Sequence, residues 1–169
     1  MNDLLWWGIS GTDWALIGAG VAAVLGGIGS AVGISVASNV TSGILSEDGT
    51  KFGKLLPIAA MPGTQGIYGF IGAVLVLIFF NLLGGQVDLP GALGFKVFLA
   101  CLPVAFQCLV SAIYQGLTGA SAARIVAADQ PAPALIFPAL VETYAVLALI
   151  VTILMLLGLQ AAAQAAGAL

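Results

Sequence analysis

Glu142 is the only carboxylate that lies deep within an apolar stretch of this 169-residue chain. A charged side chain near the middle of a membrane-spanning helix costs roughly 2.5 to 3.5 kcal/mol on insertion scales. Such a residue needs a functional reason, so Glu142 is the first candidate for function. Its chemistry would be the binding of a proton or of a metal cation.

Three other polar side chains are expected at the depth of Glu142. Counted from the two predicted turns that flank them, Thr64, Gln65, Gln115 and Glu142 each lie about 12 to 15 residues into a helix, which is roughly 18 to 22 Å at 1.5 Å per residue. This layer offers a carboxylate, two amide oxygens and a hydroxyl, which could surround a hard monovalent cation. A proton would require only the carboxylate.

The backbone before Thr64 is expected to depart from a regular helix. Pro62 removes a helical donor and frees the carbonyl of Ile58, and Gly63 adds flexibility, so a carbonyl could turn inward at this point. Unwound carbonyls at the middle of a membrane are a recurrent way to bind sodium. Tyr68 lies one helical turn beyond Thr64, on the same face, and could donate its hydroxyl to Glu142.

The elements that must position these side chains follow from composition. The chain is 61% hydrophobic and 7% charged, and residues 14–46, 55–87 and 97–123 carry no charge, whereas beyond residue 129 only Glu142 is charged. Each stretch exceeds the roughly 20 residues that cross a bilayer core as a helix. Because lipid forces the backbone to satisfy its own hydrogen bonds, the sequence predicts an all-α fold of four transmembrane helices, about 40 to 50 Å long at 1.5 Å per residue.

The chain also looks duplicated. Residues 30–48 can be laid on residues 111–129 at an offset of 81, and residues 56–64 on residues 135–143 at an offset of 79. The sequence therefore predicts two tandem hairpins in the same orientation, 1–87 and 88–169. In this register Gly63 takes the position of Glu142, so only the second hairpin carries the carboxylate.

Charge placement predicts the topology of a multi-pass protein of the cell membrane. Three of the four basic residues, Lys51, Lys54 and Arg124, flank the predicted loops 47–54 and 129–133, which are therefore expected to be cytoplasmic. Both termini would then lie on the opposite side, where an interfacial belt of tryptophans is expected at Trp6, Trp7 and Trp14.

Small residues recur along the first helix at three- or four-residue steps, at Gly18, Ala22, Gly26, Gly29 and Gly33. Such stripes let helix backbones approach closely in lipid. Either this is ordinary packing of a helix pair, or the first helix lines the inner side of a ring of many copies. Cys101 and Cys108, about 10 Å apart on one helix, are expected to be core residues and not a disulfide.

These motifs resemble the proteolipid subunit of V-type ATPases, and most closely the bacterial K subunit of the sodium-translocating type. The resemblance covers nearly the whole chain and rests on Met61-Pro62-Gly63-Thr64-Gln65-Gly66-Ile67-Tyr68-Gly69, Gln115-Gly116 and Val141-Glu142-Thr143-Tyr144-Ala145. It implies that Glu142 is the ion carrier. The implied sodium ligands are Thr64, Gln65, Gln115, Glu142 and the backbone carbonyl of Met61, where a leucine is expected, and Tyr68 would close the site.

The resemblance also implies partners. Several copies would form a homo-oligomeric rotor ring in lipid, next to a stator membrane subunit that carries an arginine. The ring would bind central-stalk subunits, which would couple its rotation to ATP hydrolysis or synthesis in a separate soluble head. The chain has no phosphate-binding Gly-rich Lys motif, so it is expected to be no enzyme by itself. Nucleic acid is not an expected partner.

Three alternatives stay open at this point. Protons could replace sodium as the carried ion, because the same carboxylate would serve. The polar layer could be a structural network worth about 0.6 kcal/mol per hydrogen bond in a four-helix scaffold. A small secondary transporter is the third, since parallel repeats occur in that class.

Overall fold

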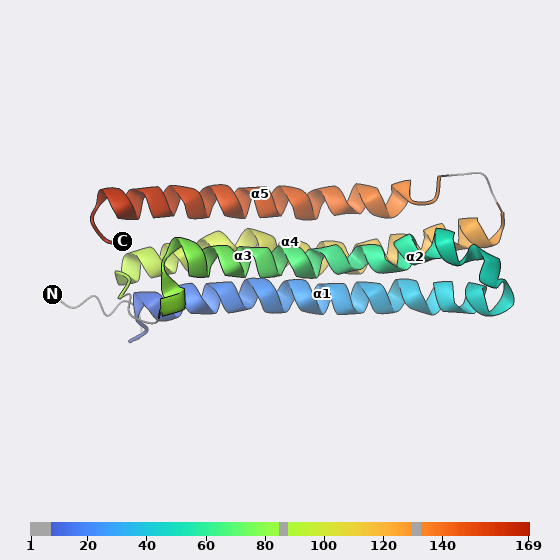
Figure 1. Ribbon diagram of the computed structural model, residues 1–169, viewed down its shortest axis with the longest axis horizontal. Coiled ribbons are helices and arrows are strands. Elements are labelled where there is room, and N and C mark those ends of the chain that lie inside the picture. The colour runs from blue at the N-terminus through green and yellow to red at the C-terminus, as the bar shows by residue number, and fades with distance from the viewer. Residues whose placement is uncertain (1–7, 85–87, 130–132) are drawn as a thin grey trace.

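The computed structural model describes residues 8–84, 88–129 and 133–169, and its regular elements are all helices (Figure 1). Four stretches are long and apolar enough to cross a membrane, Gly11–Glu47, Gly49–Phe79, Gly91–Ala127 and Ile136–Ala165. The predicted all-α fold with four membrane-spanning helices is therefore confirmed. The predicted boundary between the hairpins, at 87 and 88, adjoins residues 85–87, which lie outside the described residues, and stays a prediction.

Three of the four spans are single α-helices. These are α1 (Gly11–Glu47), α4 (Gly91–Ala127) and α5 (Ile136–Ala165). The second span is interrupted. It consists of the short 3₁₀ turn η1 (Gly49–Lys51), α2 (Phe52–Ala60), a second 3₁₀ turn η2 (Met61–Gly63) and α3 (Thr64–Phe79), and a further 3₁₀ turn, η3 (Leu82–Gly84), follows it.

The connection between the first two spans is shorter than the predicted loop 47–54. Glu47 ends α1, and Phe52 already begins α2. The Asp48 side chain accepts hydrogen bonds from the Thr50 backbone N–H at 3.0 Å and from the Thr50 hydroxyl at 2.6 Å, which folds the intervening residues into η1. Of the other predicted loop, Asp129 has a φ of 54° and Pro133 is also described, whereas residues 130–132 lie outside the described residues.

Helix α4 lies between α1 and α5 and packs along both of them (Figure 1). Helix α3 packs mainly along α1. The contact between α1 and α4 is at backbone distance. A Cβ atom added to Gly18 would lie 2.7 Å from the Cα of Phe98, and one added to Gly29 would lie 2.7 Å from the Cα of Leu109. These glycines of α1 therefore serve helix packing within the chain, as the first interpretation predicts. The second, that α1 lines the inner side of a ring, stays a prediction.

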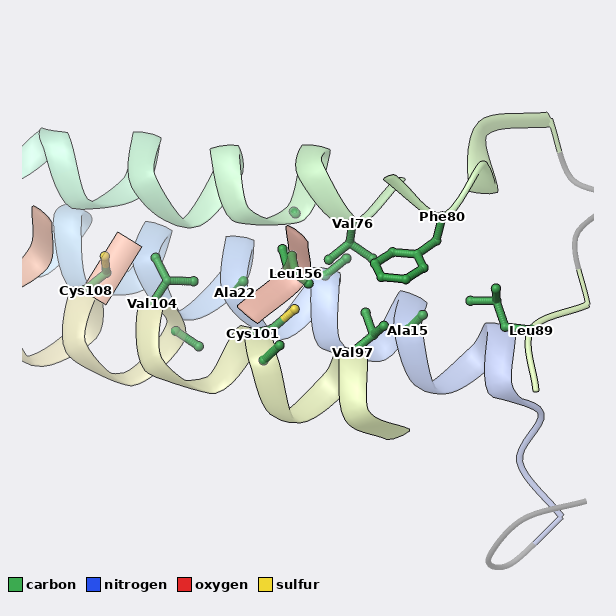
Figure 2. Packing of buried hydrophobic residues seen from close by; sticks show 14 of the residues in the cluster. Ala15, Ala22, Val76, Phe80, Leu89, Val97, Cys101, Val104, Cys108 and Leu156 are labelled. Atoms are coloured by element: carbon green, nitrogen blue, oxygen red, sulfur yellow. The ribbon is translucent and has the colours of Figure 1, made fainter. Parts of the chain in front are cut away.

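The main apolar core lies toward the end of the bundle where α1 begins, near Ala15, Phe80 and Leu89 (Figure 2). There Val76, Val97 and Leu156 bring α3, α4 and α5 together, and all three are fully buried. The two cysteines, Cys101 and Cys108, are free and buried in this core, as predicted.

The predicted tryptophan belt is wrong at Trp14. This side chain is only 9% exposed and packs edge-on against Phe95, with ring centroids 5.2 Å apart. It faces α4 because it belongs to the same face of α1 as the packed glycines, a face that the charge pattern alone did not reveal. Trp6 and Trp7 lie outside the described residues.

Candidate functional site

The carboxylate of Glu142 projects from α5 between α3 and α4 and is only partly buried. Its Oε1 accepts a hydrogen bond from the Tyr68 hydroxyl at 2.6 Å. Its Oε2 lies 2.8 Å from the Thr64 hydroxyl and 2.7 Å from Nε2 of Gln115, with Nε2 of Gln65 at 3.3 Å. The structure thus brings together all the side chains that the depth count grouped, and Tyr68 with them.

The η2 turn determines where α3 presents these groups. Pro62 and the turn it occupies end α2, so that Thr64 and Gln65 begin a new helix at the level of Glu142. The Met61 carbonyl accepts the backbone N–H of Thr64 and also its hydroxyl, at 2.9 Å. The Met61 carbonyl is therefore linked to the site by the Thr64 hydroxyl, which contacts Glu142 as well. Farther along α3, the Ser30 hydroxyl of α1 accepts a hydrogen bond from the Gly66 backbone N–H at 2.7 Å.

The two glutamines form the floor of the site and are fully buried. Nε2 of Gln65 donates to Oε1 of Gln115 at 2.6 Å, and Nε2 of Gln115 donates to the Pro138 carbonyl at 3.0 Å. A half-turn of a side-chain amide exchanges its donor for its acceptor. The same two side chains can therefore donate to an ionised Glu142 or offer their oxygens to a cation beside it.

Sequence reasoning missed two members of this arrangement, the Ser30 hydroxyl and the Pro138 carbonyl. Pro138 lies one helical turn before Glu142, and so on the same face of α5, which was an available signal. Ser30 gave a weaker signal. It was visible only as one more small residue in the α1 stripe.

No basic side chain compensates Glu142 in the part of the chain that the structure describes. Both salt bridges found there belong to Lys51, with Asp48 and Asp129. An ionised carboxylate in lipid is costly even when it is hydrogen-bonded, because hydrogen bonds do not remove its net charge. The arrangement is thus suited to take up one positive charge, either a proton or a cation.

The loop ends of the two hairpins are joined at the far end of the bundle. The Lys51 ammonium donates to the Ala127 carbonyl at 2.7 Å and to Asp129 at 3.1 Å. Hydrogen bonds from the side chain and then the backbone of Thr50 lower the pKa of Asp48, so this carboxylate stays ionised near the same ammonium. The described residues at the start of the two predicted loops, Asp48 to Lys51 and Asp129, therefore lie at one end of the molecule.

The chain matches a known family twice. The family of ATP synthase C subunits matches residues 17–76 and residues 98–155. The two segments begin 81 residues apart (17 and 98) and end 79 residues apart (76 and 155), which are the offsets found within the sequence. The duplication into two hairpins is therefore confirmed.

Two characterised relatives are similar over most of the chain. The V-type sodium ATPase subunit K of Enterococcus hirae is 35% identical over 93% of this chain and 99% of its own length. The A-type ATP synthase subunit K of Methanocaldococcus jannaschii is also 35% identical, over 84% of this chain and 61% of its own length. Together with the double family match and the four membrane-spanning helices, these likenesses show that the chain belongs to the family of ATP synthase C subunits, in its V-type proteolipid K branch, whose members are membrane rotor subunits and not enzymes by themselves.

Proposed function

We propose that this chain is the ion-carrying subunit of a rotary ATPase ring and that each copy binds one sodium ion at Glu142. The single observation that carries the proposal is the environment of that carboxylate. Thr64, Gln115 and Tyr68 contact it within 2.8 Å, and no basic side chain of the described residues does. A merely structural network has no need of an uncompensated carboxylate in lipid.

The oxygen atoms around Glu142 favour sodium over a proton as the carried ion. A proton needs one carboxylate oxygen, whereas this site adds the oxygens of Thr64, Gln65 and Gln115, with the Met61 carbonyl next to the Thr64 hydroxyl. Such neutral and anionic oxygens are the ligands of hard cations. The name of the Enterococcus hirae relative, a V-type sodium ATPase subunit, points the same way.

Charge compensation would then control rotation. A loaded Glu142 is neutral overall, so it can face lipid at low cost, whereas an empty, ionised Glu142 cannot. The ion would be released beside an arginine on a stator membrane subunit, which replaces its charge. Rotation of the ring would be coupled through central-stalk subunits to ATP hydrolysis or synthesis in a separate soluble head.

The topology belongs to the same proposal. The loop ends at residues 48–51 and 127–129 would face the cytoplasm, where the stalk binds, and both termini would face the other side of the cell membrane. Lys51 would hold the two loop ends in one arrangement for that contact.

The test is protection of Glu142 from a carboxyl-modifying carbodiimide by sodium at fixed pH, measured on the assembled complex in native membranes. Labelling should slow as sodium rises, and Glu142→Gln should remain unlabelled, since no other carboxylate lies at that depth. If labelling depended on pH alone and sodium never protected, the carried ion would be the proton and the sodium proposal would be wrong.

A further inference from the structure

Helix α1 packs against the segment that carries two of the proposed ligands, although it supplies none itself. Among the described residues, the side chains that hydrogen-bond to Glu142 come from α3 and α4. Thr64 and Gln65 are the first two residues of α3. On α1, Ser30 is only 7% exposed, and its hydroxyl accepts the hydrogen bond from the Gly66 backbone N–H. The function proposed above does not use this contact.

The Gly66 N–H needs an acceptor because α3 begins anew after the η2 turn. The first N–H groups of a helix have no acceptor within it, and a serine just before the helix often supplies one from its side chain. In α3 this position is held by Gly63, and no side-chain hydrogen bond caps the helix from there. Gly66 is the third residue of α3, to which a capping serine normally binds. Ser30 therefore caps α3 from a neighbouring helix.

Two glycines of α1, one on either side of Ser30, contact the same segment. A Cβ atom on Gly26 would lie 2.8 Å from the backbone oxygen of Gln65, and one on Gly33 would lie 2.8 Å from the Cβ of Pro62. All three α1 residues are buried. Because α1 is one uninterrupted helix, these contacts hold the start of α3 against a continuous support.

The internal repeat provides a comparison for Ser30 within the same chain. At an offset of 81 its counterpart is Ser111 of α4, which is 3% exposed and whose hydroxyl has no hydrogen-bond partner among the described residues. At an offset of 79 the counterpart of Gly66 is Ala145, which lies inside the continuous helix α5. An N–H inside a helix is already bonded four residues back. The serine thus caps a helix only in the hairpin whose second span is interrupted.

We propose that Ser30 is a positioning residue of the ion site and raises the preference of that site for sodium over protons. The inference rests on the proposed function, because it concerns how tightly the same site binds sodium. Loss of a cap loosens mainly the first turn of a helix, which here holds Thr64 and Gln65. Sodium needs the oxygens of these residues in place, whereas a proton needs only the carboxylate of Glu142. Tyr68, in the next turn, should keep its contact with Glu142.

The test compares two properties of Glu142 between the native complex and Ser30→Ala, in native membranes. The first is the sodium concentration that halves carbodiimide labelling at fixed pH. The second is the pH at which labelling without sodium falls to half of its maximum. In Ser30→Ala the half-protecting sodium concentration should rise about three- to tenfold, the size expected when a helix cap is lost. The pH midpoint should stay at its native value.

Ser111→Ala is the matched control. It removes a buried serine hydroxyl at the equivalent position of the repeat, and that hydroxyl has no partner among the described residues. Both properties should keep their native values. Ser30→Cys is a second variant, which preserves the shape of the side chain but accepts hydrogen bonds only weakly. It should behave like Ser30→Ala, and it takes the place of that variant if Ser30→Ala rings do not assemble.

A native half-protecting sodium concentration in Ser30→Ala or in Ser30→Cys would overturn the inference. An equal rise in Ser111→Ala would also overturn it, because the effect would then follow from the loss of any buried hydroxyl. So would a pH midpoint that shifts by the same factor as the sodium concentration, since that would indicate a general disturbance around Glu142. Native protein that sodium protects, with Ser30→Ala unchanged, would remove the role of Ser30 and leave the proposed function standing. Native protein that sodium never protects would refute the proposed function itself.

Discussion

At the residue scale, the Glu142 carboxylate makes close contacts with both of its oxygens. Tyr68 contacts only Oε1, whereas Thr64, Gln65 and Gln115 gather at Oε2. The two sides should therefore differ in function. The side at Oε2 is rich in oxygens that could bind a cation, and Tyr68 on the other side holds the carboxylate in place.

Replacing Thr64 by valine removes the hydroxyl and keeps the shape of the side chain. The hydroxyl contacts Glu142 at 2.8 Å and the Met61 carbonyl at 2.9 Å, so its loss takes a ligand from the ion and a partner from the carbonyl. A hydrogen bond to a charged group is worth about 1.5 to 3 kcal/mol, so the sodium concentration for half-protection from carbodiimide should rise about tenfold or more. Thr64→Ser, which keeps the hydroxyl, should stay close to the native value.

The site shows how far residue types alone can lead. Thr64, Gln65, Gln115 and Glu142 could be grouped from the sequence because a helix rises by a constant amount per residue, so depth can be counted. The directions of their hydrogen bonds could not be read in this way. The Gln115 amide donates a hydrogen bond to the backbone carbonyl of Pro138. Because every residue has a backbone carbonyl, the sequence does not indicate which one a side chain will contact.

At the element scale, the interrupted second span and the glycines of α1 decide the packing. The Pro62-Gly63 pair predicted a break in the helix at Met61–Gly63, but it did not predict that the break would be a 3₁₀ turn. The α1 glycines could be recognised as a stripe, but their partner helix could not be chosen from the sequence. The choice depends on three-dimensional neighbours such as Leu109 of α4.

Gly29→Ala should destabilise the bundle. Its Cβ would lie 2.7 Å from the Cα and the carbonyl oxygen of Leu109, so the two helices must move apart. Overpacking of this kind costs about 1 to 3 kcal/mol and should lower the thermal unfolding midpoint in detergent.

Gly43→Ala on the same helix is the control, because a Cβ there meets nothing within 4 Å. It should leave the midpoint unchanged or raise it, since alanine favours a helix over glycine by about 1 kcal/mol. If Gly29→Ala were as stable as Gly43→Ala, the close contact of α1 and α4 would be wrong.

At the scale of the whole molecule, the four-helix, twice-repeated architecture could be predicted because apolar length and repeat offsets are properties of sequence alone. The tryptophan belt could not, at least at Trp14, because burial against Phe95 depends on which face of α1 meets α4. The sidedness proposed from the basic residues is a separate matter that concerns the membrane and not the fold.

Sidedness can be tested with single cysteines at the two ends of the bundle. Gly49 lies in η1 and Ala166 just after α5, and both are solvent-accessible. A membrane-impermeant maleimide should label Gly49→Cys only from the cytoplasmic side and Ala166→Cys only from the other side, in vesicles stripped of the soluble head. The opposite pattern would invert the proposed topology.

The most direct test of the central claim is the binding of radioactive sodium to purified rings. The proposal predicts saturable binding of one sodium ion per chain, lost in Glu142→Gln rings of the same assembled size and weakened in Thr64→Val. Saturable binding that survives in Glu142→Gln, or no binding by native rings at a pH where Glu142 reacts with carbodiimide, would contradict the claim that this carboxylate carries the ion.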